Sequence, residues 1–151
     1  MKILLAVDGS DFGDAAVEEV ARRPWPAGSE VKVLSVIEPP LMPTTDTWVL
    51  PDSYYEEVEK AGEDQANKIV NKAIERLRSA ETSMLELSTE IVKGYPKHAI
   101  VDEAERWGAD LIVLGSHGYS GLTRLLLGSV SQAVASHAKC SVEIVRHPKA
   151  D

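Results

Sequence analysis

Short apolar runs alternate with amphipathic helical segments along the whole chain, and this alternation constrains the fold more than any other feature. Lys2 to Val7 and Leu111 to Leu114 are apolar apart from Lys2, and a glycine-containing turn follows each run. Unbroken apolar runs of this length are typical of strands buried on both faces, as in parallel sheets. Parallel neighbours need long crossover connections, which helices supply. We therefore expect a three-layer α/β sandwich with a five-stranded parallel sheet.

The remaining elements follow from the same periodicities. The alternating pattern from Leu85 to Val92 predicts an exposed edge strand, and the other expected strands are 31–37 and 142–145. Three helices are expected to begin at Ser10 or Asp11, at Pro96 and at Gly128. A fourth, longer helix carries apolar residues at helical spacing: Ala66, Ile69, Val70, Ala73, Ile74 and Leu77. Ligands of such sheets bind at the carboxyl ends of the strands.

Length and composition fit one domain that spans residues 1–151. The chain has 44% hydrophobic and 26% charged residues, which is ordinary for a globular protein. Cys140 is the only cysteine and so excludes an internal disulfide framework. The sequence shows no leader and no apolar run of membrane length, so we expect a cytoplasmic protein. The net charge of -8 argues against nucleic acid or an anionic membrane as a partner.

A segment rich in glycine and hydroxyl residues follows the apolar run that ends at Leu114. It reads Gly115-Ser116-His117-Gly118, then nine further residues, then Gly128-Ser129-Val130-Ser131. Glycines let the backbone approach a ligand closely, and a helix start presents unpaired amides and the positive end of the helix dipole. We expect Ser129 to cap this helix, and we expect the segment to bind a phosphate-bearing ligand.

No aspartate or glutamate lies between Asp110 and Glu143, although the chain contains 24 acidic residues. At average density this 32-residue stretch would hold about five, and it holds Arg124, Lys139 and two histidines instead. A nearby carboxylate would repel phosphate, so an anion site explains the gap. The alternative is that buried strands and a packed helix carry few charges in any case.

These features resemble the universal stress protein family over essentially the whole chain. The three glycines and Ser129 match the Gly-x2-Gly-x9-Gly-[Ser/Thr] signature of its nucleotide-binding members without gaps. The first strand with its terminal Asp8 and the segment Ala109 to Gly118 are also similar to the family's typical sequence. The closing segment, Cys140 to Val145, departs from the common Cys-Pro-Val-Leu pattern by reading Cys-Ser-Val-Glu. The resemblance implies an adenine nucleotide α-hydrolase-like fold with sheet order 3-2-1-4-5. It also implies ATP, ADP or AMP as ligand, with Mg²⁺ carried on the phosphates.

The resemblance further implies a role for each matching position. Asp8 would meet the ribose or the adenine, and residues of the first two strands would line the base. The turn at 115–118 would wrap the ribose and phosphates, and residues 128–131 would receive the phosphates through amides and hydroxyls. The predicted binding residues are Ala6, Val7, Asp8, Val36, Leu114, Gly115, His117, Gly118, Gly128, Ser129, Val130 and Ser131.

Several positions near this segment have a second interpretation. Asp8 could serve only in the turn before the first helix, and His117 could be an exposed loop histidine. Arg124 could reach the phosphates or lie on the surface of a packed turn. The Pro- and Thr-rich connection from Pro39 to Ser53 is either a lid over the site or a plain surface loop.

The sequence contains no recognisable catalytic apparatus. A P-loop lysine, a Rossmann glycine pattern after the first strand and the Ser-Gly-Gly-x-Asp-Ser loop of ATP pyrophosphatases are all absent, and the histidines show no metal-ligand spacing. We therefore expect an ATP-binding sensor or regulator of a stress response with little or no turnover. The alternatives are an interaction module that binds no nucleotide and a slow ATPase.

The resemblance also implies a homodimer formed through the last strand, Val142 to Arg146. An alternating edge strand can pair with a second copy of itself, whereas the charge of Glu143 would discourage such pairing.

Overall fold

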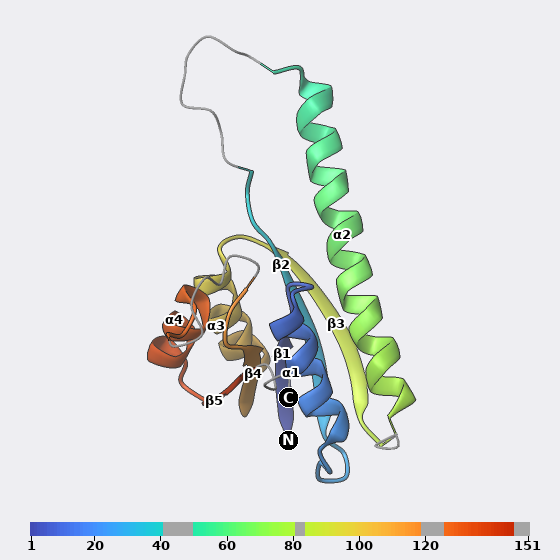
Figure 1. The fold of residues 1–151 in the computed structure, drawn as a ribbon, viewed down its shortest axis with the longest axis vertical. Helices are drawn as coiled ribbons and strands as arrows, with labels where there is room; N and C mark the ends of the chain where they lie inside the picture. The colour runs from blue at the N-terminus through green and yellow to red at the C-terminus, as the bar shows by residue number, and fades with distance from the viewer. Residues whose placement is uncertain (41–49, 81–83, 119–125, 147–151) are drawn as a thin grey trace.

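The computed structural model describes residues 1–40, 50–80, 84–118 and 126–146, which form five strands and four helices (Figure 1). In chain order the elements are β1 (Lys2–Ala6), α1 (Asp11–Arg22), β2 (Glu30–Ile37), α2 (Asp52–Ser79), β3 (Glu86–Lys93), α3 (Pro96–Trp107), β4 (Leu111–Gly115), α4 (Ser129–His137) and β5 (Ser141–Val145). Strands and helices alternate as expected, and each strand differs from its expected range by no more than one residue at either end.

The five strands form one parallel sheet in the order β3-β2-β1-β4-β5. This confirms the expected sheet order, and β3 lies at an edge as its alternating pattern predicted. The central strand β1 is paired on both sides, and its residues Ile3, Leu4 and Leu5 are fully buried. Because β1 and β4 are neighbours, with Ala6 opposite Leu114, the segments that leave these two strands emerge next to each other.

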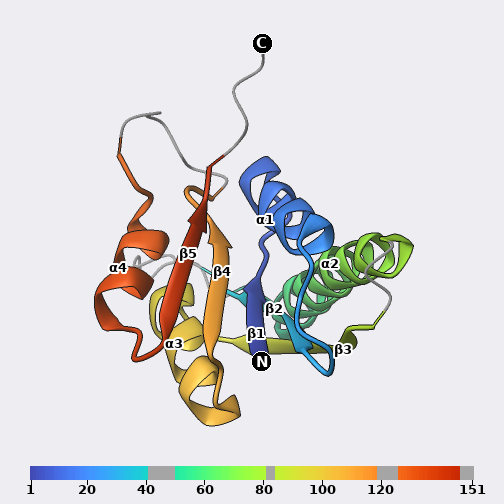
Figure 2. The same cartoon turned by 90° about the horizontal axis from the view of Figure 1, so that it is seen from below.

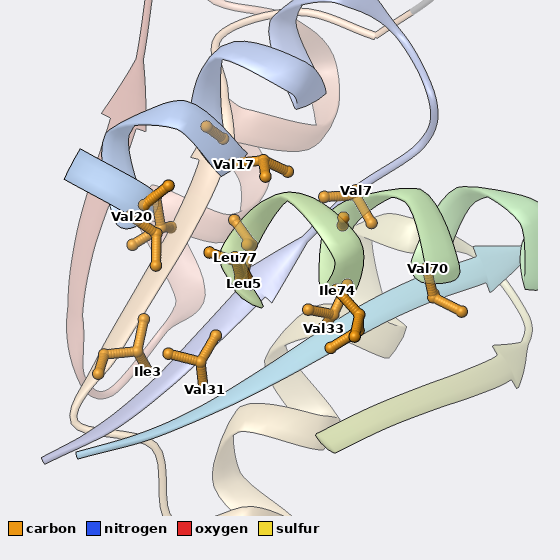
Figure 3. Packing of buried hydrophobic residues seen from close by; sticks show 14 of the residues in the cluster. Ile3, Leu5, Val7, Val17, Val20, Val31, Val33, Val70, Ile74 and Leu77 are labelled. Carbon is orange, nitrogen blue, oxygen red and sulfur yellow. The ribbon is translucent and has the colours of Figure 1, made fainter. Parts of the chain in front are cut away.

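Helices cover both faces of the sheet (Figure 2). α1 and α2 pack on one face over a cluster that includes Ile3, Leu5 and Ile74 (Figure 3). α3 and α4 pack on the other face over a cluster that includes Leu4 and Ile112. Alternate residues of each central strand thus belong to different cores, which explains why the strand sequences are apolar throughout.

The long helix α2 has two dissimilar halves. Its buried residues all lie between Ala66 and Leu77, while its first half extends beyond the ends of β2 and β3 (Figure 1). The acidic stretch from Glu56 to Asp64 is largely exposed, and Glu59 and Glu63 form ion pairs with Lys93 at the end of β3. Within the described ranges, none of the helices combines the length and the apolar character needed to span a bilayer.

A buried ion pair that the sequence did not predict lies under α3. Lys32 of β2 is 2.9 Å from Glu103, and Arg106 also donates to the Glu103 carboxylate. The Lys32 ammonium lies 4.8 Å from the centre of the Trp107 ring. Burial alone would raise the pKa of Glu103, but the hydrogen bonds from Arg106 and Lys32 outweigh it and hold that pKa below its usual value.

Candidate functional site

Three segments meet at the carboxyl edge of β1 and β4: the residues after β1, the turn after β4, and the beginning of α4. Asp8 follows β1, and a Cβ atom placed on Gly118 would lie 2.9 Å from its Oδ2. The structure therefore brings together Asp8 and the 115–118 turn, which are more than a hundred residues apart in the chain.

Hydrogen bonds fix the turn against α4 and against β5. The carbonyl of Ser116 accepts from the Gly128 amide at 2.8 Å and from the Ser131 hydroxyl at 2.9 Å. The Ser116 amide donates to the carbonyl of Val145 at 2.8 Å. The Ser131 side chain is buried and also donates to the Gly128 carbonyl. Its hydroxyl therefore points into the structure, and its backbone amide is the group left for a ligand.

The first turn of α4 is not capped by a side chain of any described residue. Gly128 is the N-cap residue and Ser129 is the first residue of the helix, so the expectation that Ser129 caps this helix was wrong. Gly128 has an extended backbone, and its amide donates to the Ser116 carbonyl, so the helix begins only at the next residue. The amides of Ser129, Val130 and Ser131 have no acceptor inside the helix, and the first turn holds no acidic residue. This helix start is suited to an anion.

Two glycines of the signature each bring two backbone segments into close contact. A Cβ atom on Gly115 would lie 2.6 Å from the backbone carbon and oxygen of Phe12, and one on Gly128 would lie 3.0 Å from the Ser116 carbonyl oxygen. Gly118 differs, because an added Cβ atom would meet the carboxylate at the end of the flexible Asp8 side chain. Gly115 and Gly128 are thus required for packing of the protein itself, in addition to any approach of a ligand.

Asp8 is exposed, and its two carboxylate oxygens have different surroundings. Oδ1 accepts from the amide and from the hydroxyl of Ser10, which confirms the turn interpretation for that oxygen. Ser10 in turn caps α1 by accepting from the Gly13 amide at 3.2 Å. Oδ2 is the oxygen that faces Gly118, so a ligand contact of Asp8 would use this atom.

His117 is half-buried, unlike the exposed loop histidine of the second interpretation. Its Nδ1 atom lies 3.0 Å from the Ser116 hydroxyl. Its Nε2 atom is shielded from solvent and has no hydrogen-bond partner in the part of the chain that the structure describes.

The ring of Phe12, in the first turn of α1, lies with its centroid 5.1 Å from that of the His117 ring. Sequence reasoning missed Phe12, although one signal was available. It is the only phenylalanine of the chain, and it precedes Ala16 and Val20 at helical spacing without being buried as they are.

The predicted binding residues on and beside the strands do not all lie on one face of the sheet. Ala6 and Leu114 are buried in the α3/α4 core, and Val36 packs partly against that core. Val7 belongs to the opposite core and lines a cavity of about 220 Å³ between α1 and α2, to which Lys68 also contributes. The structure therefore groups Ala6, Val36 and Leu114 and separates the Val7 side chain from them.

Other expectations at this edge fall partly outside the described residues. Arg124 lies outside them, as does most of the connection from Pro39 to Ser53. Among the described residues, no three His, Cys, Asp or Glu side chains gather to form a possible metal site. Cys140 is half-buried against the α3/α4 core, and this burial raises the pKa of its thiol.

Residues 1–146 match the universal stress protein family. The chain is 32% identical over 148 residues to the universal stress protein YxiE of Bacillus subtilis, covering 96% of this chain and 98% of that relative. It is 28% identical to UspA of Lactobacillus plantarum, whose solved structure gives a TM-score of 0.71 and covers 97% of both chains. A universal stress protein solved in complex with cAMP is 27% identical, with a TM-score of 0.65 and 96% coverage of both chains.

The parallel sheet order and the flanking helices define a three-layer α/β protein of the adenine nucleotide α-hydrolase-like type, the fold shared with these solved structures. With the match extending over 1–146, this chain belongs to the universal stress protein family.

Proposed function

We propose that this protein binds an adenine nucleotide at the carboxyl edge of β1 and β4 and acts as a nucleotide-dependent regulator in the cytoplasm. The observation that carries the proposal is the first turn of α4, whose amides lie at the carboxyl edge of the sheet without a side-chain cap from the described residues. In this arrangement the phosphates meet Ser129, Val130 and the amide of Ser131. Ala6, Val36 and Leu114 lie toward the base, and Asp8 Oδ2 meets the ribose. Mg²⁺ accompanies the phosphates as part of the ligand.

Two further observations support an adenine nucleotide as the ligand. One related universal stress protein, 27% identical to this chain, was solved in complex with cAMP. The chain also keeps the full Gly-x2-Gly-x9-Gly-Ser signature, and its segment from 111 to 142 lacks carboxylates. A phosphate group next to α4 therefore meets no carboxylate from its own segment.

The first test is direct measurement of binding. Purified protein is denatured and the released nucleotide is identified by chromatography; the refolded or nucleotide-stripped protein is then titrated with ATP, AMP and cAMP by calorimetry. We expect at least one of these to bind with a Kd below about 1 mM. Absence of released nucleotide, together with no binding of all three at millimolar concentration, would contradict the proposal.

The Ser129→Glu variant tests the place of binding. Its carboxylate would lie in the first turn of α4, where it stabilises the helix by about 0.3–1 kcal/mol and repels phosphate. We expect nucleotide affinity to fall at least about tenfold while thermal stability is unchanged or raised. The matched control is Ser129→Gln, which has similar size and no charge. Equal nucleotide affinity of the two variants would mean that the phosphates bind away from the first turn of α4.

The second candidate is an interaction module that binds no nucleotide, and the packing of the glycines favours it. Gly115 and Gly128 are in close contact with backbone atoms of the protein, so they would be retained for the fold alone. The two candidates differ in the behaviour of the Ser129 variants, because an interaction module would tolerate Glu and Gln at this exposed position equally.

We propose that the protein hydrolyses ATP slowly or not at all. Phosphoryl transfer relies on well-placed positive charge and an oriented nucleophile. The predicted binding residues supply amides, hydroxyls, one imidazole and one carboxylate, and none is a lysine or arginine. Phosphate release from ATP at a rate above that of a Ser129→Glu control would instead favour the ATPase alternative.

We also propose that β5 pairs with its counterpart in a homodimer. The carboxylate of Glu143 accepts two hydrogen bonds from Arg23, both of 2.7 Å, so its charge is held against the end of α1 instead of along the strand edge. This removes the objection that a charged edge would discourage pairing. Light scattering is expected to give the mass of a dimer, and a monomer at high protein concentration would contradict this proposal.

A further inference from the structure

Phe12 connects the first turn of α1 to the predicted nucleotide site. Its side chain is half-buried and does not belong to the buried set of α1. Instead, its ring lies against the His117 ring at 5.1 Å between centroids, with an angle of 50° between the ring planes. Aromatic pairs at this separation attract one another beyond the area that they bury.

The contact is held in place by the backbone beneath it. Because Gly115 has no side chain, the backbone of Phe12 can sit directly on the end of β4, where a Cβ atom would lie 2.6 Å from it. The first turn of α1 is further fixed by the Ser10 cap on Gly13. Phe12 therefore lies over residue 117 with little freedom to move away.

The His117 ring is restrained from two directions. Phe12 packs on it from α1, and the Ser116 hydroxyl lies 3.0 Å from Nδ1. This contact restrains the rotation of the ring and thereby fixes the direction in which Nε2 points. That Nε2 atom is shielded and lacks a partner among the described residues, an unfavourable arrangement that a protein retains when something else supplies the partner.

We propose that Phe12 is a positioning residue of the nucleotide site, which holds the His117 imidazole so that a bound nucleotide meets Nε2 in one orientation. The inference rests on the proposed function and adds to it a residue outside the family signature. A group that is already fixed before binding loses less conformational freedom when the ligand arrives, so Phe12 raises affinity without touching the nucleotide itself.

Nucleotide titration of Phe12→Leu tests the inference. Leucine keeps apolar bulk in the first turn of α1 and removes the aromatic face. We expect its Kd for the adenine nucleotide that binds best to be about three- to tenfold weaker than in the unmodified protein. Phe12→Tyr retains the ring and should restore most of the affinity.

Val20→Ala is the matched control. Val20 is fully buried on the same helix and lies in the α1/α2 core, so its truncation lowers stability without touching His117. We expect it to melt at a lower temperature than Phe12→Leu and yet bind nucleotide as the unmodified protein does. A loss of affinity in Val20→Ala equal to that in Phe12→Leu would assign the effect to general stability and overturn the inference.

The ring resonances of His117 give a readout that a purely structural role would not change. In the unmodified protein, adding nucleotide is expected to shift the ¹⁵N signal of Nε2, and in Phe12→Leu this shift should be reduced. Unchanged affinity and an unchanged Nε2 shift in Phe12→Leu would overturn the role of Phe12 alone. Failure of the unmodified protein to bind any adenine nucleotide would overturn the proposed function and this inference with it.

Discussion

The helices α1 and α4 both begin at the carboxyl edge of the sheet, on opposite faces, and their first turns are built differently. α1 is capped by the Ser10 hydroxyl and carries Asp11 and Asp14 in its first turn. α4 starts after Gly128, is capped by no described side chain and has no acidic residue in its first turn. The same structural position thus serves the stability of the fold in α1, while in α4 it leaves amides available for an anion.

The two starts are linked through the end of β4. Gly115 lies under the Phe12 backbone on the α1 side, and the next residue, Ser116, accepts the Gly128 amide on the α4 side. A change at Gly115 is therefore the most direct way to disturb both helix starts at once.

The largest effect on stability is expected for Gly115→Ala. The new methyl group would lie 2.6 Å from backbone atoms of Phe12, which cannot move without shifting α1. Forced overpacking of this kind is expected to lower the free energy of unfolding by about 3 kcal/mol, measured by urea titration. Gly62→Ala is the control, because its methyl group would meet only the Cγ2 atom of the Ile37 side chain, at 3.2 Å. This tight contact opposes the gain of about 1 kcal/mol in helix propensity, so the net change should be small. Equal stability of the two variants would show that α1 is not docked tightly on β4.

A smaller effect on stability is expected when the serines at the starts of α1 and α4, Ser10 and Ser129, are exchanged for alanine. Ser10→Ala removes the cap of α1 and should lower the free energy of unfolding by about 1 kcal/mol. Ser129→Ala removes an exposed hydroxyl that caps nothing and should change it by less than about 0.5 kcal/mol. Thermal denaturation of both variants side by side measures the difference, and a larger loss for Ser129→Ala would reverse the assignment of roles.

The smallest effect on stability is expected when the pH is lowered. Hydrogen bonds from Arg76 lower the pKa of Glu18, and those from Arg22 and Arg23 lower the pKa of Glu19, in each case against a raising effect of burial. A carboxylate whose pKa is lowered on folding stabilises the protein above its unfolded pKa, and this contribution is lost as the pH falls through the folded value.

Both groups are on α1, and α4 carries no carboxylate. Hydrogen exchange measured as the pH is lowered below about 4.5 should therefore show α1 losing protection before α4 does. Protection lost first in α4 would contradict this part of the comparison.

Most of the fold could be predicted from the sequence because its signals are local. The apolar run of β1, the Ser10 cap and Pro96 at the start of α3 each depend on a few neighbouring residues, and the structure confirms all three. Ser129 was the local signal that misled, because a hydroxyl residue after glycine is typical of a cap. Here the backbone contact of Gly128 with the 115–118 turn decides where the helix starts.

The candidate site was predictable in outline and less so in detail. The group Ala6, Val36 and Leu114 lies on one face of the sheet, but Val7 points to the other because side chains alternate along a strand. The pairing of Lys32 with Glu103 could not be foreseen either, since it joins residues 71 positions apart in the chain. Such contacts depend on how helices are set against the sheet, which no short window of sequence encodes.

By itself, then, the sequence determined the alternation of strands and helices, the signature of glycines and the absence of carboxylates from 111 to 142. Only the tertiary structure decided which backbone segments those glycines bring together, that Glu143 is bound by Arg23, and that Phe12 lies over His117. The physical reason is the range of the interactions. Periodicity and capping act over a few residues, whereas close packing joins segments that meet only after the sheet has formed.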